Sequence, residues 1–324
     1  MSLPEYNLPW IDSPFFNAEL RDSKLSEEDK AFVKHFADEG YVIFDPKIEE
    51  SEIDLIVAEL MPKFNKLETE DKRIQDAWTF NERVRKIASL NIVYEKLRLL
   101  YKREPFPFQT LNFPVGTQQN THSDMIHFNS IPQRFMCGVW IAFEDITNDN
   151  GPLHYYPKSH KLPFYDMIDM GVKASDNIEK KKAMMVYFEN YELFIQEIIN
   201  ALGLKKEVLN IKKGQALIWS SNLLHGGEHI LRPGASRHSQ VTHYYFNDCM
   251  YYSPKYSDVA INKIYLTDLV NIKTGEKIVN KYFDEVVNRS TKLQFQMQAV
   301  KMLSKIAPLF PRPIVDMVRS AIMR

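Results

Sequence analysis

The sequence predicts a mainly β domain that carries helices before, inside and after its strands. Between residues 106 and 246, short runs rich in β-branched and aromatic residues alternate with proline and glycine, as is typical of strands separated by turns. In the first hundred residues, and again near 178–202, apolar side chains recur at helical spacing instead. The length of 324 residues suits one large barrel or sandwich with helical additions, and no repeat or low-complexity linker divides it. We therefore expect a single domain over residues 1–324.

Three stretches make up this expected domain. Residues 1–105 are predicted to be mostly helical, with one helix that begins after the capping residue Ser26. Residues 106–250 form the β core, which a helical insertion at about 165–205 interrupts. Residues 251–324 form a C-terminal extension that is helical at its end. The strands that we expect are 41–44, 108–113, 135–143, 153–156, 208–211, 215–219 and 239–246.

Composition and charge exclude several classes of protein. Apolar residues make up 44% and charged residues 26%, so the chain can bury a core and is not disordered. Lysine plus arginine (41) balance aspartate plus glutamate (42), which leaves no basic excess for nucleic acid. The two cysteines, Cys137 and Cys249, lack a metal or redox spacing, so neither a disulfide framework nor a zinc–thiolate site is expected. With no secretory signal and no apolar run of bilayer length, we expect a cytoplasmic protein without a transmembrane segment.

Three residues have the pattern of a metal site, and we refer to them as the triad: His122, Asp124 and His225. In a strand, residues i and i+2 project to the same face, so His122 and Asp124 can point at one atom. A second imidazole from a different strand completes two nitrogens and one carboxylate on one face of an octahedral ion. This is the facial triad of non-haem Fe(II) oxygenases, whose open positions receive a chelating co-substrate and dioxygen. Taken alone, the His-x-Asp pair has a simpler interpretation as a solvated loop pair.

A nearby arginine strengthens the metal-site interpretation. Arg237 follows His225 by twelve positions and opens the alternating stretch that ends at Phe246. An inward-pointing arginine on the strand after the second histidine can hold the far carboxylate of a dicarboxylate co-substrate through a bidentate pair.

Further motifs surround these residues in a fixed order. Along residues 106–246 they are Thr121-His-Ser-Asp-Met-Ile-His-Phe128, Val139-Trp-Ile-Ala-Phe-Glu-Asp145, Asn150-Gly-Pro-Leu153, Tyr156-Pro-Lys-Ser-His160, Leu224-His-Gly226 and the strand that begins at Arg237. Together they resemble the phytanoyl-CoA dioxygenase family of Fe(II)/2-oxoglutarate oxygenases. An ordered set with nearly the family's spacing is far more specific than any one motif.

The resemblance implies a fold, a cofactor and roles for particular residues. The fold is a double-stranded β-helix, the jelly-roll, cupin-like barrel of two facing sheets. The triad supplies the ligands of Fe(II) and the catalytic residues, with 2-oxoglutarate and O2 as co-substrates. Arg237 holds the C5 carboxylate of 2-oxoglutarate, and Trp140 and Gln109 are further co-substrate contacts.

Two details of the triad region bear on these roles. The family usually places its arginine eleven positions after the second histidine, whereas Arg237 lies twelve after His225. A one-residue loop insertion accounts for the difference, and Arg232, at plus seven, is the alternative co-substrate arginine. Related halogenases carry glycine or alanine in place of Asp124, so a carboxylate here argues for hydroxylation or another oxidation.

The implied activity is hydroxylation of a small-molecule biosynthetic intermediate with release of succinate and CO2. Desaturation, ring closure or epimerisation by the same chemistry are alternatives. A cupin-like protein that binds a metal or small ligand without turnover is a second kind of alternative, and a degenerate family member that acts through interactions is a third.

Several polar residues near the triad have both a functional and a structural interpretation. His127 and His154 either line the substrate pocket or serve ordinary packing. His160 is expected to brace its loop, and His243 to make a structural hydrogen bond. A polar rim would suit a substrate with hydroxyl or amide groups, unless these residues form a solvated loop; it consists of Gln118, Gln119, Asn120, Thr121, Asn129 and Ser130.

The last 25 residues, 300–324, are basic and amphipathic. Apolar side chains recur at roughly helical spacing, and the charged residues are Lys301, Lys305, Arg312, Arg319, Arg324 and the single acid Asp316. The main expectation is docking on the protein's own barrel or on a second subunit. Peripheral contact with a membrane surface is the alternative.

Overall fold

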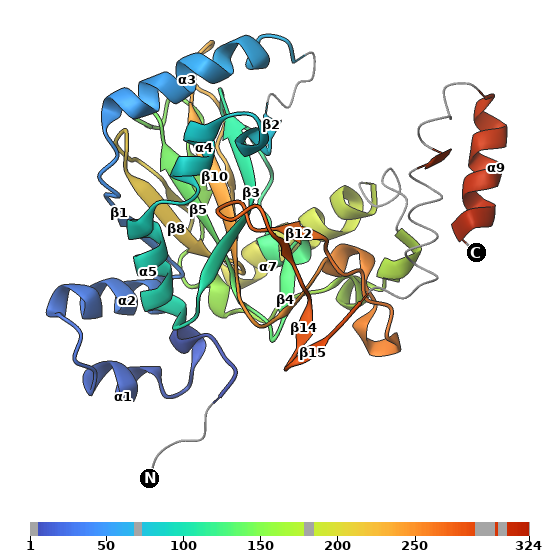
Figure 1. Cartoon of the computed structure of the whole chain (residues 1–324), viewed down its shortest axis with the longest axis horizontal. Coiled ribbons are helices and arrows are strands. Elements are labelled where there is room, and N and C mark those ends of the chain that lie inside the picture. Colours follow the sequence, from blue (N-terminus) through green and yellow to red (C-terminus); the bar gives the residue numbers. More distant parts are fainter. Residues whose placement is uncertain (1–5, 68–72, 178–184, 289–301, 304–309, 324) are drawn as a thin grey trace.

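Two sheets form the core of the molecule. The computed structural model describes residues 6–67, 73–177, 185–288, 302–303 and 310–323. The larger sheet is antiparallel, with strand order β1 (Tyr41–Phe44), β8 (Ala216–Ser220), β5 (Met136–Ala142), β10 (Ser239–Phe246), β3 (Pro105–Phe113) and β2 (Ile74–Gln75) (Figure 1). The smaller sheet has the order β7 (Glu207–Val208), β6 (Leu153–Tyr155) and β9 (His225–Gly227). Trp140 and Leu217 of the larger sheet pack with Tyr155 of the smaller one, so the chain forms the predicted double-stranded β-helix.

Strand register decides which side chains face the interior. On β10, Val241 lies opposite Trp140 of β5 and Leu111 of β3, and all three belong to the apolar cluster between the sheets. The alternate residues point outward, where the Tyr244 hydroxyl donates to the carbonyl of Ala88. This period of two is the one on which the sequence prediction rested. It places every second residue of β10 inside the barrel.

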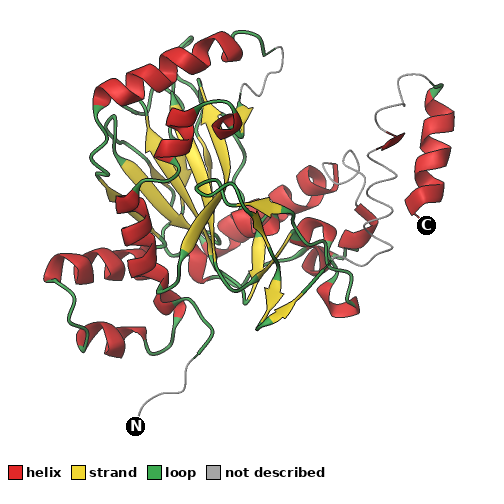
Figure 2. Cartoon of the chain, in the orientation of Figure 1, coloured by secondary structure: helices red, strands yellow, loops and turns green. Residues whose placement is uncertain are grey.

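Helices from the first hundred residues cover the outer face of the larger sheet (Figure 2). Ser26 caps α2 as predicted, because its hydroxyl oxygen accepts from the backbone N–H of Asp29. Apolar side chains of these helices share one core cluster with the outward residues of β5 and β8. The helices are η1 (Trp10–Asp12), α1 (Phe16–Arg21), α2 (Glu27–Glu39), α3 (Glu50–Phe64), η2 (Ala77–Thr79), α4 (Glu82–Ile87) and α5 (Asn91–Tyr101).

The insertion in the β core consists of short helices that pack beside the smaller sheet. It contains η5 (Met167–Met170), η6 (Ala174–Asn177), the π-helix η7 (Tyr187–Glu192) and α7 (Leu193–Leu202), whereas η4 (Ser159–Lys161) precedes it. Residues 178–184 of the predicted helix lie outside the described residues. Tyr187 and Tyr191 pack with Ile126 and Leu224, which are close in sequence to the triad. The insertion therefore covers the region of the triad.

The C-terminal extension begins as small strands and ends as a helix. β11 (Met250–Tyr252) pairs with β4 (Asn129–Ile131), and η8 (Pro254–Tyr256) and η9 (Val259–Ile261) follow. Two hairpins come next: β12 (Leu269–Val270) with β13 (Lys277–Ile278), and β14 (Lys281–Tyr282) with β15 (Glu285–Val286).

The final helix, α9 (Arg312–Met323), stands apart from the barrel in Figure 1. Ile314 and Met317 are exposed and Val315 is buried. Three of the predicted basic residues, Lys301, Lys305 and Arg324, lie outside the described part of the chain. No helix among the described residues is long and apolar enough to cross a membrane.

Two local predictions are wrong in detail. The expected strand 208–211 is reduced to β7, and Ile211 makes only an isolated bridge with Ile146. The segment that holds His122 and Asp124 is not a regular strand either: His122 forms a single bridge, and Asp124 begins the 3-10 helix η3 (Asp124–Ile126). The reason is local, because the Ser123 hydroxyl oxygen accepts from the N–H of Met125 and starts the helical turn.

Candidate metal centre

Backbone pairing brings the triad together. The N–H of His122 donates to the carbonyl of His225 at 2.9 Å, and the N–H of His225 donates back at 3.0 Å. Because His225 belongs to β9, this bridge ties the segment before η3 to the smaller sheet. Ser123 keeps an extended backbone, so Asp124 still projects to the same side as His122. The prediction that these side chains converge is therefore correct although the strand is missing.

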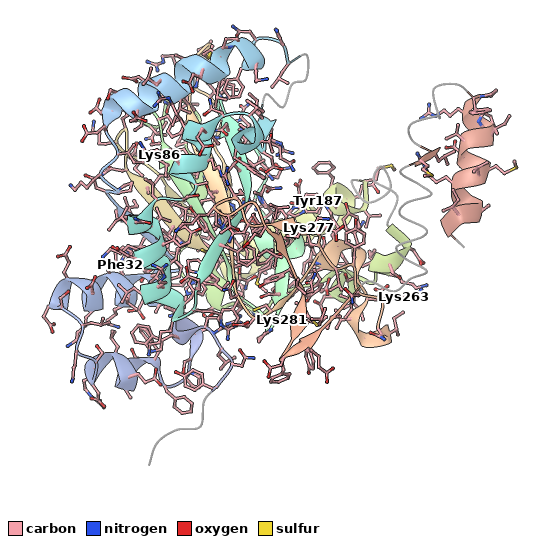
Figure 3. The ribbon with its side chains drawn as sticks, in the orientation of Figure 1. Phe32, Lys86, Tyr187, Lys263, Lys277 and Lys281 are labelled. Atoms are coloured by element: carbon pink, nitrogen blue, oxygen red, sulfur yellow. The ribbon has the colours of Figure 1, made fainter. Side chains whose placement is uncertain are left out.

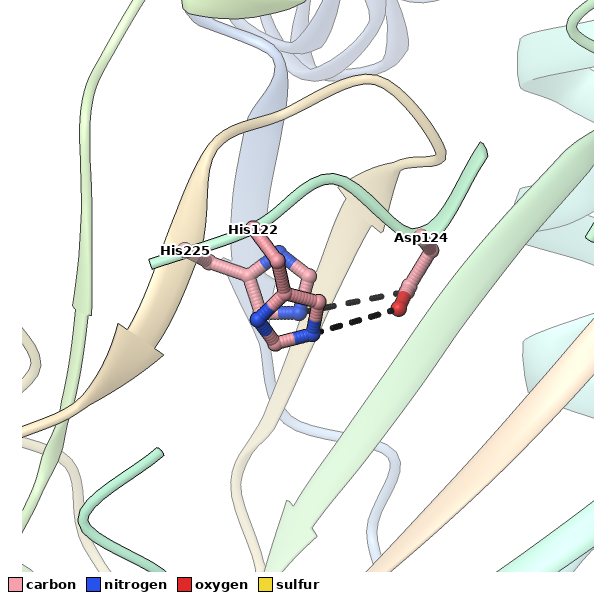
Figure 4. A group of neighbouring side chains, drawn as sticks. All are labelled: His122, Asp124 and His225. Carbon is pink, nitrogen blue, oxygen red and sulfur yellow. Dashed lines mark ion pairs between the residues drawn. The ribbon is translucent and has the colours of Figure 1, made fainter. Parts of the chain in front are cut away.

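The geometry of the triad fits one small cation. Nε2 of His122 lies 3.7 Å from Oδ1 of Asp124, and Nε2 of His225 lies 3.9 Å from Oδ2 (Figure 4). One ligand atom from each residue lies within 4.8 Å of the others. The three residues are only 5%, 4% and 8% exposed, respectively. Two imidazole nitrogens and one carboxylate in this arrangement suit Fe(II) with open coordination positions.

Backbone carbonyls fix the orientation of both imidazoles. Nδ1 of His122 lies 2.9 Å from the carbonyl of Asn120, and Nδ1 of His225 lies 2.9 Å from the carbonyl of Leu223. A carbonyl oxygen only accepts, so each Nδ1 carries the proton and each Nε2 keeps its lone pair for a metal. In both cases the partner is two residues earlier in the chain.

The carboxylate of Asp124 is oriented from the other side. The indole Nε1 of Trp219 donates to Oδ2 of Asp124 at 2.8 Å, and Nε2 of His243 lies 3.6 Å from the same oxygen. His243 in turn contacts Oε1 of Gln109 through Nδ1 at 2.9 Å, which is the structural hydrogen bond predicted for it. Gln109, expected to contact the co-substrate, thus reaches the triad through His243.

Burial keeps the triad in the protonation state that binds metal. It lowers the pKa of His122 to about 4, helped by the neighbouring His225, and it also lowers the pKa of His225. Burial alone would raise the pKa of Asp124, but the imidazoles of His225, His243 and His122 outweigh it and lower that pKa below its ordinary value. At neutral pH the site offers two neutral imidazoles and one carboxylate.

Arg237 lies inside the same barrel, and no carboxylate of the described residues forms an ion pair with it. It is 1% exposed, and its guanidinium donates from Nη1 to the carbonyl of Gly151 at 3.1 Å. The guanidinium lies 5.8 Å from the rings of Phe113 and Trp140, and its Nε is buried without a hydrogen-bond partner. Burial lowers the pKa of Arg237 to about 10, against a smaller opposing effect of Glu144. A buried cation of this kind is destabilising unless an anion binds beside it.

Two further buried polar atoms of this region also lack partners among the described residues. They are the indole Nε1 of Trp140 and the hydroxyl of Ser239. Ser239 lies opposite Phe113 on β3 and opposite Ala142 on β5, two residues along β5 from Trp140. A carboxylate such as C5 of 2-oxoglutarate would satisfy these donors, so the chain's residues fit the co-substrate. Arg232, the alternative arginine, is exposed in the loop before β10.

His154 and His160 brace the structure around the site. His154 contacts the Thr121 hydroxyl through Nε2 at 2.7 Å and Glu228 through Nδ1 at 2.8 Å. His160 contacts the carbonyl of Ala37 through Nε2 at 3.2 Å, so it ties its loop to α2 as predicted. Of the polar rim, the side chain that reaches a triad atom is Gln119, whose amide lies 3.3 Å from Nε2 of His122.

Sequence reasoning missed Trp219 and Ser239. Of the two, only Ser239 had a signal in the sequence. Ser239 follows Arg237 by two positions and so shares its face of the extended chain. Trp219 lies in an expected strand, but its contact with Asp124 depends on packing across the barrel and has no signal in spacing.

A family model provides the decisive comparison. Residues 12–239 match the model of phytanoyl-CoA dioxygenase (PhyH). The chain belongs to this family. The family consists of 2-oxoglutarate-dependent non-haem iron oxygenases, so the protein is an enzyme of that class, with iron as cofactor and 2-oxoglutarate and O2 as co-substrates. Among curated proteins, no relative matches.

Solved structures show the same fold at low identity. The epimerase SnoN in complex with Fe3+, α-ketoglutarate and nogalamycin RO is 14% identical, with a TM-score of 0.51 over 69% of this chain and 86% of that one. The carbocyclase SnoK from nogalamycin biosynthesis is 17% identical, with a TM-score of 0.52 over 70% of this chain and 87% of that one. These similarities establish a shared fold for the dioxygenase domain.

Proposed function

We propose that this PhyH-family protein hydroxylates a small, polar biosynthetic intermediate. In the balanced reaction, substrate C–H, O2 and 2-oxoglutarate give substrate C–OH, succinate and CO2. The observation that carries the proposal is the buried triad His122–Asp124–His225 in one barrel with the buried Arg237, which has no carboxylate partner among the described residues. Iron, when bound, supplies the activation of O2 that oxidises the co-substrate and the substrate.

The chain's own residues bind and orient the reactants in this proposal. Nε2 of His122, Nε2 of His225 and a carboxylate oxygen of Asp124 hold the metal on one face. Arg237 holds the distal carboxylate of 2-oxoglutarate, with Trp140 and Ser239 as neighbouring donors. Because the triad is almost fully buried, the site also excludes bulk water from the reaction.

The reaction type is open to direct test. The neighbours SnoN and SnoK are described as an epimerase and a carbocyclase, so this fold also serves outcomes other than hydroxylation. We expect iron-loaded protein to release succinate with a panel of polar metabolites, and the product to gain one oxygen atom by mass spectrometry. A product two hydrogens lighter would indicate desaturation or ring closure instead. No succinate with any member of the panel would favour a non-catalytic binding protein.

Organisation and location follow the same interpretation. We propose one domain, because β1 pairs with β8 of the core and β11 of the extension pairs with β4. We also propose a cytoplasmic location, which agrees with Cys137 and Cys249 being free thiols.

A further inference from the structure

Lys255 is a buried lysine of the C-terminal extension, beyond the residues that match the family model. Lys255 lies in η8 and is only 9% exposed. Its ammonium Nζ lies 3.1 Å from Nδ1 of His127, within hydrogen-bond distance. In the part of the chain that the structure describes, no carboxylate forms an ion pair with it. A buried ammonium without an anion is costly, because its lost hydration is not replaced.

The surroundings of Lys255 place it one side chain away from the triad. The ring of His127 lies 6.2 Å from that of His122 and 4.9 Å from that of Tyr187. Nζ of Lys255 lies 5.5 Å from the centre of the Tyr187 ring (Figure 3 labels Tyr187). The Tyr187 hydroxyl is buried and has no hydrogen-bond partner among the residues that the structure describes. Lysine, histidine and tyrosine thus gather beside the candidate metal centre.

The backbone around Lys255 is held firmly in place. The carboxylate of Asp258 accepts from the N–H groups of Ala174 at 3.0 Å and Ser175 at 2.9 Å, which joins the extension to the insertion. η8 also packs against η3, the helical turn that begins at Asp124. Two separate contacts therefore hold the segment that carries Lys255 next to the metal centre, as the support of a binding group needs.

We propose that Lys255 binds an anionic group of the substrate, a carboxylate or a phosphate, beside the iron site. An ammonium has three donors, and one directed at His127 leaves two for anionic oxygens. The co-substrate has its own cation, since Arg237 lies elsewhere in the barrel against Phe113 and Trp140. The proposal rests on the proposed function and specifies its substrate class: a small anionic metabolite. Burial lowers the pKa of Lys255 to about 8, which leaves the ammonium protonated at neutral pH, and a bound anion would raise this pKa again.

The test compares Lys255→Met with a matched control, Lys263→Met, in the full-length protein loaded with Fe(II) and 2-oxoglutarate. Lys263 lies in the same extension but is exposed. Binding of inorganic phosphate and of acetate is measured separately by calorimetry, which distinguishes the two anion sources. We expect wild type and Lys263→Met to bind at least one of these anions, and Lys255→Met to bind it about 10- to 100-fold more weakly. Lys255→Arg should retain most of the affinity.

Activity gives a second measurement. In a succinate-release screen, each acid or phosphate ester is paired with its uncharged amide or alcohol. We expect stimulation by anionic members and its loss in Lys255→Met. Iron content and 2-oxoglutarate affinity should be unchanged in that variant, so a folding defect would be visible. If Lys255→Met binds the anions and turns over like wild type, or if only uncharged members stimulate, the proposal is wrong. If wild type itself fails to bind iron and 2-oxoglutarate, the proposed function fails instead.

Discussion

Each iron-binding imidazole is oriented by the backbone carbonyl two residues before it. Asn120 serves His122, and Leu223 serves His225. The ring orientation is therefore a property of the local chain conformation and exists before metal binds. Asp124 differs, because its oxygen is held by Trp219 from a distant strand. Replacing one of the triad residues removes a metal ligand, whereas replacing Trp219 removes only the group that orients the Asp124 carboxylate.

Arg237 permits a prediction about the co-substrate. We expect Arg237→Gln to raise the KM for 2-oxoglutarate strongly, because a buried carboxylate would lose its charged partner at a cost of about 2–5 kcal/mol. Steady-state succinate formation at varied 2-oxoglutarate measures this. Arg232→Gln is the matched control and should leave the KM unchanged, since that side chain is exposed. A raised KM in the Arg232 variant alone would assign the role to Arg232.

At the scale of elements, strands β5 and β8 position Trp219 through a glycine. Gly138 lies opposite Trp219 in the register, and a Cβ at this position would meet the indole ring directly. Only a residue without a side chain leaves room for the ring that donates to Asp124. The contact explains why one glycine lies within an otherwise bulky buried strand.

Gly138→Ala should therefore weaken both folding and iron binding. We expect about 1–3 kcal/mol less stability to denaturant because the alanine overpacks the strand pair, and lower Fe(II) affinity because the indole moves away from Asp124. Trp219→Phe provides the control background, since phenylalanine lacks the indole atoms that the new Cβ would meet. In that background Gly138→Ala should cost less. An equal loss of stability in both backgrounds would show that the indole contact is not the cause.

The last helix gives a prediction at the same scale. α9 exposes Ile314 and Met317, and the expected role is docking on protein, with membrane contact as the alternative. Removal of residues 311–324 should leave co-sedimentation with anionic lipid vesicles unchanged. Loss of vesicle binding on this truncation would support an interfacial membrane helix instead.

Elements that depend on neighbouring residues could be predicted from the sequence, and features that depend on contacts between distant segments could not. Strands β3, β5, β8 and β10 follow from alternation and turns, and the α2 cap follows from Ser26, so all were predictable. The triad was predictable because three residue types in family order mark it. Trp219, Gly138 and Lys255 act through contacts between segments far apart in the chain, and such contacts have no sequence period. The 3-10 turn at Asp124 depended on a single serine hydroxyl, which strand periodicity does not reveal.

At the scale of the whole molecule, buried neutral histidines make the fold sensitive to acid. His160, away from the triad, illustrates the effect: burial lowers its pKa to about 4. The unfolded chain, with an ordinary histidine pKa of about 6.5, then binds more protons than the folded chain at intermediate pH. Stability is therefore complete above about pH 6.5 and is lost as the pH falls toward 4, by about 1.4 kcal/mol per pH unit for each such histidine.

Urea unfolding of the metal-free protein between pH 7 and pH 4.5 measures this effect. We expect His160→Gln to flatten the pH dependence, whatever its effect on stability at pH 7. His35→Gln, at an exposed position, should leave the slope as in wild type. An unaltered slope in the His160 variant would mean that this histidine does not contribute to the acid sensitivity.

The central claim is that the triad holds iron and that 2-oxoglutarate binds through it. Anaerobic titration of the metal-free protein with Fe(II), followed by 2-oxoglutarate, tests it most directly, with calorimetry and visible absorption as readouts. We predict one Fe(II) per chain and a 2-oxoglutarate-dependent charge-transfer band in wild type. His122→Ala and His225→Ala should remain folded by circular dichroism but lose both signals. Unchanged iron stoichiometry and an unchanged band in these two variants would contradict the account.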